Sequence, residues 1–228
     1  MTKKFLILLI IIFLCSIGIT VFLFKDYFFL KNNQPIIKET LDFEKYLAIG
    51  YSQEQIVRLF AELDRLNSSL EDNPNDYNTL LKIGNIYMMI KEYEKAEIVF
   101  LKIIEIEPAF APAYANLGEL YGSFWEEKSK AVDNYKKAIE LYPWKSQYYR
   151  TLADLYRSDF PDKKNEIEPL MLKGMKEYPD NVDFYTYLVS YFRQENNIPK
   201  AINYLEQALR IEPDNITLKQ ELVELEGI

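Results

Sequence analysis

The sequence predicts an all-α protein in which an N-terminal transmembrane helix is followed by a stack of helical hairpins. Two observations predict this fold class. Phe5 to Phe24 is an uncharged and largely apolar run, and from Tyr77 onward an apolar pattern of helical periodicity that ends in proline recurs four times. Apolar residues at every third or fourth position indicate amphipathic helices, whereas an uninterrupted apolar run indicates a membrane span.

The membrane anchor is predicted from the length of the first run and from its lack of charge. Twenty residues at a rise of about 1.5 Å each reach about 30 Å, the thickness of the hydrocarbon core of a bilayer. Lys3 and Lys4 precede the run, and Lys25 follows it. We therefore expect residues 1–24 to form a short basic tail and a single-pass anchor. Residues along this anchor include Phe5, Leu9, Leu14 and Phe24.

A cleaved signal peptide is the competing interpretation of the first run. Ser16, Ile17 and Gly18 offer small residues at a cleavage spacing, but six largely apolar residues follow them, which favours an uncleaved anchor. A short basic tail usually stays in the cytoplasm, and long acidic domains are translocated readily. We therefore expect the large domain on the extracytoplasmic, periplasmic side of the membrane.

Composition excludes several classes of function. The net charge is −8, which argues against nucleic acid as a partner. Histidine is absent and Cys15 is the single cysteine, so Ser-His-Asp or Cys-His nucleophiles and His/Cys zinc sites cannot form. The sequence also lacks a glycine-rich phosphate-binding loop. We predict no catalytic site, no metal and no cofactor, with a carboxylate-based enzyme as a minor alternative.

The recurring pattern is marked by four prolines, Pro108, Pro143, Pro179 and Pro213. Because proline cannot continue a helix, each one marks the end of the second helix of a hairpin. Each first helix has a large residue, then an apolar–small pair, then an aromatic residue. The four sets are Leu80, Ile83-Gly84, Tyr87; Tyr114, Leu117-Gly118, Tyr121; Tyr149, Leu152-Ala153, Tyr156; and Tyr185, Leu188-Val189, Phe192.

These columns resemble the tetratricopeptide repeat family. The second helices match it as well, with alanine, a bulky residue and a further residue before the proline. These sets are Ala96, Phe100, Ile103; Ala131, Tyr135, Ala138; and Ala201, Leu205, Ala208. The resemblance implies a right-handed α–α superhelix of helical hairpins. It implies a repeat region over residues 77–213. The four repeats are residues 77–110, 111–145, 146–181 and 182–215, so the last one includes the turn after Pro213.

The third repeat departs from the pattern. It has two extra residues, with Pro161 in its turn and Pro169 in the first turn of its second helix, where a missing N–H is harmless. Ile167, Met171 and Gly174 stand in its second-helix column. We expect this repeat to be the least regular of the four.

The segments that flank the repeats are assigned from caps and composition. Residues 25–51 are predicted to be a juxtamembrane linker, and residues 52–76 a helix that begins with a capping box of Ser52 and Gln55. Residues 216–228 are predicted to be a C-terminal capping helix. Gly50 and Pro74 each lie one repeat length before Gly84 and Pro108, which hints at a decayed fifth repeat.

The resemblance implies a partner-binding inner surface formed by the first helices, which takes a peptide or helix of another protein. Residues spaced to face it are Asn85, Met88, Asn116, Glu119, Arg150, Asp154, Arg157, Ser190 and Arg193. Three of these are arginines in an otherwise acidic domain. They either form a basic patch that holds a carboxylate of an acidic partner through forked hydrogen bonds, or pair with nearby aspartates.

We therefore expect a non-enzymatic scaffold or adaptor that holds a partner at the membrane surface during assembly of an envelope complex. The alternative is a co-chaperone-like maturation factor with transient clients, as in cytochrome or pilus biogenesis. The chaperone-tail clamp of some family members is not expected, because Leu81 and Gln147 stand where it requires basic residues.

Overall fold

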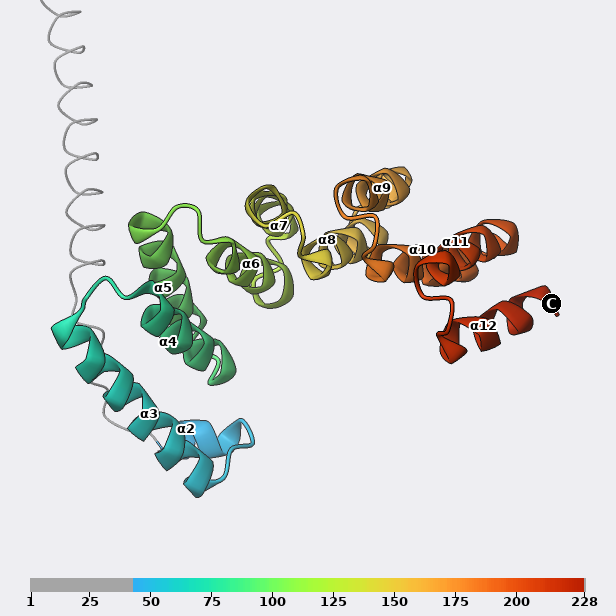
Figure 1. Cartoon of the computed structure of the whole chain (residues 1–228). Coiled ribbons are helices and arrows are strands. Elements are labelled where there is room, and N and C mark those ends of the chain that lie inside the picture. Colours follow the sequence, from blue (N-terminus) through green and yellow to red (C-terminus); the bar gives the residue numbers. More distant parts are fainter. Residues whose placement is uncertain (1–42, 228) are drawn as a thin grey trace, which may run out of the picture. The chain divides into compact units, whose positions relative to one another are not determined.

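The computed structural model describes residues 43–227, in which helices are joined by turns and no strand occurs (Figure 1). The predicted all-α fold is confirmed for these residues, whereas the anchor predicted within residues 1–24 lies outside them. Between residues 43 and 227, no helix combines the length and apolar character that a membrane span requires. The chain divides into two compact units, Met1–Lys102 and Ile103–Ile228.

The first compact unit has four helices in its described part. These are α2 (Phe43–Ala48), α3 (Gln53–Asp72), α4 (Tyr77–Met89) and most of α5 (Tyr93–Ile106). The capping box of α3 forms as its motif predicts: the Gln55 amide donates to Ser52 Oγ at 3.2 Å, and the Ser52 amide donates to Gln55 Oε1 at 2.8 Å. Helix α3 buries one apolar stripe and packs against α4.

Helix α2 corrects the prediction of a linker over residues 25–51 at its described end. Tyr46 is 3% exposed, its ring centroid lies 5.3 Å from that of Phe60, and its hydroxyl donates to Glu92 Oε1 at 2.9 Å. Lys45 forms an ion pair with the same buried carboxylate. Because a helix of six residues is not stable alone, these contacts are what order α2. The sequence pattern around residue 46 was too short to reveal it.

The hint of a fifth repeat does not hold at Gly50. Gly50 lies in the turn between α2 and α3 with a φ of +101°, and a Cβ atom there would meet nothing within 4 Å. Gly84, one repeat length later, lies inside α4. Pro74 does follow the end of α3, but α3 has 20 residues where α5 has 14. Gly50 and Gly84 are therefore one repeat length apart in sequence but occupy different structural positions.

The second compact unit continues from the end of α5 through seven further α-helices. They are α6 (Ala111–Glu119), α7 (Lys128–Leu141), α8 (Ser146–Asp159), α9 (Ile167–Glu177), α10 (Val182–Gln194), α11 (Ile198–Ile211) and α12 (Ile216–Glu226). Helices α6 and α7, α8 and α9, and α10 and α11 pair as hairpins, and α12 packs on α11 (Figure 1). Asn215 caps α12, since its side chain accepts from the Leu218 amide at 3.2 Å.

Glycine allows the two helices of a hairpin to approach closely. A Cβ atom on Gly84 in α4 would lie 2.4 Å from Cε1 of Phe100 in α5. A Cβ atom on Gly118 in α6 would lie 2.8 Å from Cε2 of Tyr135 in α7. Both separations are far shorter than van der Waals contact, so only glycine permits these rings to lie directly on the first helix. The predicted role of the glycine column is confirmed at both positions.

Irregular helical segments accommodate the two extra residues of the third repeat and one extra residue of the second repeat, which lies near residues 125–130. Helix α6 ends in a π-helix, η1 (Leu120–Phe124), which takes up one additional residue within the turn. Helix α8 is followed by a 3₁₀-helix, η2 (Pro161–Glu166). Pro169 is the third residue of α9 and so lies in the first turn, as predicted. Backbone N–H groups of the first turn have no partner within the helix, so the N–H that proline lacks costs no helical hydrogen bond.

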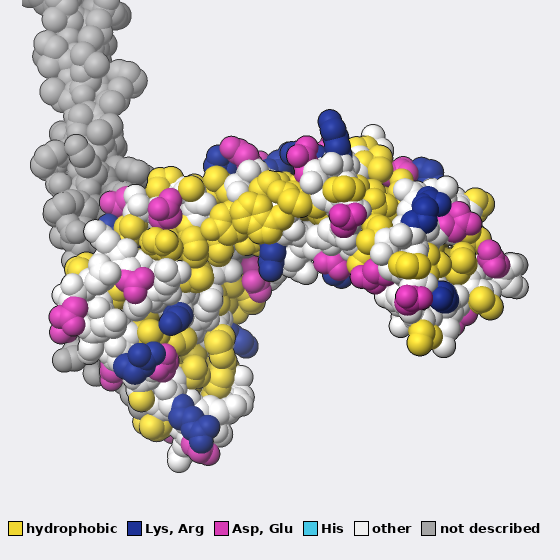
Figure 2. Space-filling view, viewed as in Figure 1, with side chains coloured by type: hydrophobic (Ala, Val, Ile, Leu, Met, Phe, Trp, Pro, Cys, Tyr) yellow, Lys and Arg dark blue, Asp and Glu magenta, His cyan; other side chains and the backbone are white. Residues whose placement is uncertain are grey.

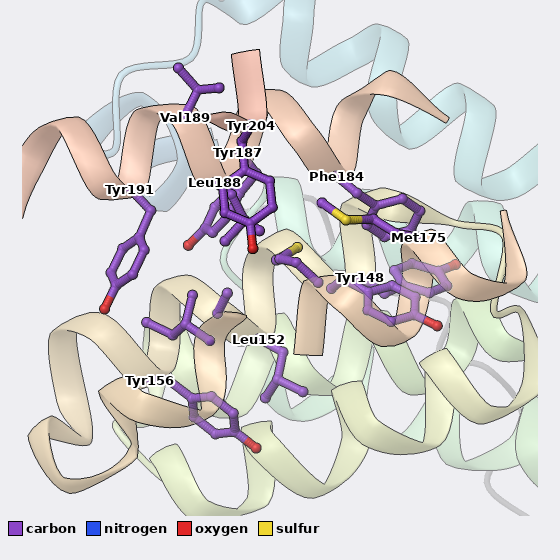
Figure 3. Packing of buried hydrophobic residues seen from close by; sticks show 14 of the residues in the cluster. Tyr148, Leu152, Tyr156, Met175, Phe184, Tyr187, Leu188, Val189, Tyr191 and Tyr204 are labelled. Atoms are coloured by element: carbon purple, nitrogen blue, oxygen red, sulfur yellow. The ribbon is translucent and has the colours of Figure 1, made fainter. Parts of the chain in front are cut away.

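The third and fourth hairpins share one continuous core (Figure 3). The Phe184 ring of α10 is fully buried and lies beside Met175 of α9. It also meets the Tyr149 ring of α8 edge to face, with ring centroids 5.1 Å apart. Gly174 of α9 leaves room for this ring. The irregular third hairpin therefore shares its buried core with the fourth, although its column residues differ.

The turns inside three hairpins contain a non-glycine residue with positive φ. Lys91 has a φ of 61°, Glu126 of 54° and Asn196 of 57°. In each turn the next amide donates back to the first helix at 2.8 Å, for example Glu92 to the Tyr87 carbonyl. This is the αL helix end that glycine adopts most easily and that asparagine tolerates. Two of the three turns therefore contain a residue that is poorly suited to its backbone conformation.

Lys91→Gly is expected to raise the free energy of unfolding by about 1 kcal/mol, because it removes the Cβ atom that opposes positive φ. Lys91 is exposed, so little packing is lost. Chemical denaturation of the full chain in detergent measures the change. Lys91→Ala is the control, since alanine retains the Cβ atom. An equal gain in the alanine variant contradicts the argument from backbone conformation.

Candidate functional site

Three side-chain contacts tie α8 to α10 within the second compact unit. Ser146 Oγ donates to Asp183 Oδ2 at 2.6 Å near the start of both helices. Further along, the Tyr187 hydroxyl donates to Asp154 Oδ1 at 2.9 Å. Near the end of both helices, an Arg157 guanidinium nitrogen donates to Gln194 Oε1 at 2.6 Å. These ties fix the first helices of the third and fourth hairpins against each other along most of their length.

A pocket of about 270 Å³ opens between these two helices. We call it the arginine pocket. It is lined by Arg150, Asp154, Arg157, Thr186, Tyr187 and Ser190. The lining residues of α8 recur at spacings of four and three, and Ser190 of α10 follows Thr186 and Tyr187 by four and three residues, so each helix presents one face to the pocket. A volume of this size admits a side chain or a chain end rather than a whole helix.

The two arginines of the pocket are in different states. Arg157 also forms an ion pair with Asp154, with its Nη2 atom 3.0 Å from Oδ1, so both terminal nitrogens of its guanidinium group already contact acceptors of the protein. Arg150 is exposed, and no carboxylate of residues 43–227 lies within ion-pair distance of it. Arg157 therefore follows the ion-pair alternative raised by the sequence, while the fork of Arg150 is open to a ligand.

Tyr187 keeps its proton and acts as a donor in the pocket. Burial raises the pKa of Tyr187 well above its usual range, and the charge and hydrogen bond of Asp154 raise it further. Arg157 and Arg150 oppose this shift. A hydroxyl that stays protonated holds the Asp154 carboxylate in place over the whole physiological pH range. The pocket therefore has a fixed acidic side chain among its cations.

The structure brings together four of the predicted partner-binding residues and leaves the other five outside the arginine pocket. Those in the pocket are Arg150, Asp154, Arg157 and Ser190. Arg193 lies beyond it on α10, with its Nη1 atom 3.6 Å from Glu221 Oε1 of α12. Asn116 and Glu119 are on α6 and do not line it. Asn85 and Met88 are on α4, in the first compact unit.

Sequence reasoning missed two residues of this site, Tyr187 and Gln194. Both contact α8, Tyr187 through Asp154 and Gln194 through Arg157. They are seven residues apart, which is two helical turns and so places both on one helix face. That spacing shows that the two residues share a face, but it does not show that this face meets α8, so the sequence offered no signal for their partners.

The charged side chains of the described residues are spread over the helices. Within residues 43–227, no three acidic or sulfur side chains gather as a metal site. On the face seen in Figure 2, basic and acidic side chains are interspersed over the helices. The arginine pocket differs from this mixed surface in that it places two guanidinium groups and one carboxylate around one hollow.

Comparisons with known proteins agree with the fold. A family model described as tetratricopeptide repeat matches residues 77–110, 111–143 and 183–215. No curated protein matches the chain. The chain is similar to a crystal structure of MamA protein, with 23% sequence identity and a TM-score of 0.53. The matched region covers 75% of this chain and 92% of the MamA chain.

Two further solved structures are similar over nearly their whole length. MamA from Desulfovibrio magneticus RS-1 is 17% identical, covers 78% of this chain and 99% of its own, and has a TM-score of 0.52. The thermophilic protein TTC0263 from Thermus thermophilus is 15% identical, with coverages of 81% and 99% and a TM-score of 0.52. At these identities the likeness shows the fold alone.

Proposed function

Because the chain carries tetratricopeptide repeats, we propose that it is a non-enzymatic adaptor that binds another protein through the first helices of its hairpins. The observation that carries this proposal is the arginine pocket between α8 and α10, in which the guanidinium group of Arg150 is open. A polypeptide with an acidic group suits such a pocket, because guanidinium–carboxylate pairs are strong and directional. The hairpins would stack as the right-handed superhelix that such repeats form.

The proposal includes attachment to the membrane through residues 1–24, with the repeat domain on the extracytoplasmic side. Its support is the uncharged run from Phe5 to Phe24 with basic residues before it. An adaptor held in this way would keep its partner at the membrane surface, as assembly of an envelope complex requires. The structure describes neither this run nor the segment that joins it to α2.

Membrane attachment predicts that the chain stays in the pellet when isolated membranes are washed with alkaline carbonate. Leu9→Arg combined with Leu14→Arg places two charges within the run, each costing about 3 kcal/mol at the centre of a bilayer, and should release the chain. Protease added to right-side-out vesicles should degrade the repeat domain of the unaltered chain. Release of the unaltered chain, or protection of its repeats from protease, contradicts this part of the proposal.

The adaptor function is tested by crosslinking in native membranes. Arg150→Glu reverses the open charge of the pocket without removing a tie between α8 and α10, and should lower the capture of the partner at least about tenfold. Arg210→Glu is the matched control, because Arg210 is an exposed arginine of α11 outside the pocket. It should leave capture unchanged.

The outcome also separates the two classes of adaptor. One stable partner indicates a scaffold, whereas many weakly captured clients indicate a maturation factor. Identical capture by the unaltered chain and Arg150→Glu removes the arginine pocket from the proposal.

A further inference from the structure

We propose that Asp154 determines which anion the arginine pocket accepts, so that the pocket takes a single carboxylate and rejects a phosphate group. This inference rests on the proposed function and goes beyond it, because it names the chemical class of the group that enters the pocket. The chemistry is shared by two sources in a partner protein: the side chain of an acidic residue and the carboxyl end of a chain.

The charge of the arginine pocket suits a group with one negative charge. Two guanidinium groups and one carboxylate line it, which leaves one net positive charge. A carboxylate carries one negative charge and so neutralises the pocket. A phosphate monoester carries close to two negative charges near neutral pH. Its binding would leave an uncompensated negative charge in a partly enclosed site, where charges interact more strongly than in water.

The free hydrogen-bond donors of the pocket are few. The guanidinium fork of Arg150 contacts no carboxylate of the described chain, and the exposed Ser190 hydroxyl forms no hydrogen bond within residues 43–227. The Thr186 hydroxyl lies 3.3 Å from the Val182 carbonyl and 3.2 Å from that of Asp183, so it donates within its own helix. One fork and one hydroxyl suit the two oxygens of a carboxylate. The three oxygens of a phosphate group need more donors.

Asp154 is held in place by two contacts within the pocket. Its Oδ1 atom accepts a hydrogen bond from the Tyr187 hydroxyl at 2.9 Å and forms an ion pair with Arg157, whose Nη2 atom lies 3.0 Å away. These bonds hold the carboxylate at the pocket wall, where it has no proton to offer an incoming anion. Asp154 thus withholds Arg157 from the ligand and repels a second negative charge. Asparagine at this position keeps an oxygen that accepts from the Tyr187 hydroxyl but removes the charge.

The test uses the full chain in detergent micelles, labelled with ¹⁵N in its arginine side chains. The Nε–H signal of Arg150, assigned from Arg150→Lys, is followed while three probes are added. N-acetylalanine presents a terminal carboxylate, N-acetylglutamate α-amide presents a side-chain carboxylate, and N-acetylphosphoserine amide presents a phosphate group. The first two probes distinguish the two sources of the carboxylate.

In the unaltered chain, at least one carboxylate probe is expected to bind about tenfold more tightly than the phosphate probe. Asp154→Asn should tighten phosphate binding about tenfold and so abolish the preference. Asp159→Asn is the matched control, because it removes the same charge from the same helix outside the pocket. It should change each affinity less than about twofold, which is the effect of a screened surface charge.

Phosphate binding that equals carboxylate binding in the unaltered chain overturns the inference. An unchanged preference in Asp154→Asn overturns it as well, as does an Arg150 signal that no probe shifts up to its solubility limit. These failures are distinguishable from failure of the adaptor function. Loss of partner capture in Arg150→Glu would still support a partner at this surface, recognised by contacts other than a carboxylate.

Discussion

Replacement of Gly174 by leucine is expected to lower the free energy of unfolding of the second compact unit by about 3 kcal/mol. A Cβ atom at Gly174 would lie 2.3 Å from Cε1 and 2.5 Å from Cζ of Phe184. Phe184 is fully buried beside Met175 and Tyr149, so its ring has no free space to enter. A side chain at residue 174 must therefore force α9 away from α10.

Alanine tests the same contact with the smallest side chain. In an exposed helix, a change from glycine to alanine stabilises by about 1 kcal/mol through helix propensity. At residue 174 the overlap with Phe184 opposes that gain, so Gly174→Ala should be destabilising. Gly118→Leu should cost less than Gly174→Leu, because a Cβ atom at Gly118 approaches the Tyr135 ring only to 2.8 Å.

Denaturant unfolding of the full chain in detergent measures these differences. Lys176→Leu is the matched control for Gly174→Leu, because it adds the same side chain at an exposed position of α9. The control should change the free energy of unfolding by no more than about 0.5 kcal/mol. Equal midpoints for Gly174→Leu and Lys176→Leu contradict the close approach of α9 and α10.

Tyr46→Ala is expected to release α2 from the first compact unit. Truncation of a buried aromatic side chain costs about 3–5 kcal/mol. Tyr46 supplies both the ring against Phe60 and the hydroxyl bond to Glu92, and α2 has only six residues. A helix that short has no stability of its own, so losing these contacts should unfold α2 locally while α3 and α4 remain folded.

Hydrogen exchange of the full chain reports this local release. Amides of residues 43–50 should exchange about a hundredfold faster in Tyr46→Ala than in the unaltered chain, which corresponds to a loss of about 3 kcal/mol. Glu44→Ala changes an exposed residue of the same helix and should leave their exchange nearly unaltered. Faster exchange in α4 as well would show that α2 supports the whole unit.

The hairpins were predictable because each level of the sequence indicates the same structure. Prolines mark the ends of second helices, and the glycine positions on first helices coincide with bulky residues on second helices. Gly84 with Phe100 and Gly118 with Tyr135 are such pairs, and both meet in the structure. The short helix α2 was not predictable, since its order depends on Glu92, which lies far away in the sequence.

The site was predictable in part. Helical spacing placed Arg150, Asp154 and Arg157 on one face, and the structure puts all three in one pocket. Spacing within a helix contains no information about the neighbouring helix, so the partners Tyr187 and Gln194 were missed. For the same reason the sequence could not decide which arginine is paired and which is open.

The third hairpin shows where a column pattern stops being informative. Tyr114 and Tyr185 donate to the carbonyls of Pro108 and Pro179 at 3.2 Å. Tyr149 has the same place in its repeat, yet it is fully buried against Phe184, and its hydroxyl has no partner within residues 43–227. The family model likewise passes over residues 144–182, where α8 and α9 nevertheless form a hairpin.

The π-helix at Leu120–Phe124 bears on how this chain can vary in length. A widened turn absorbs a residue at the tip of a hairpin, after the last contact of the glycine column. The helices that follow keep their phase, so their buried faces still meet. We therefore expect an insertion at a hairpin tip to leave the conformation of the other hairpins unchanged. An insertion inside a helix would instead rotate every later side chain of that helix by about 100°.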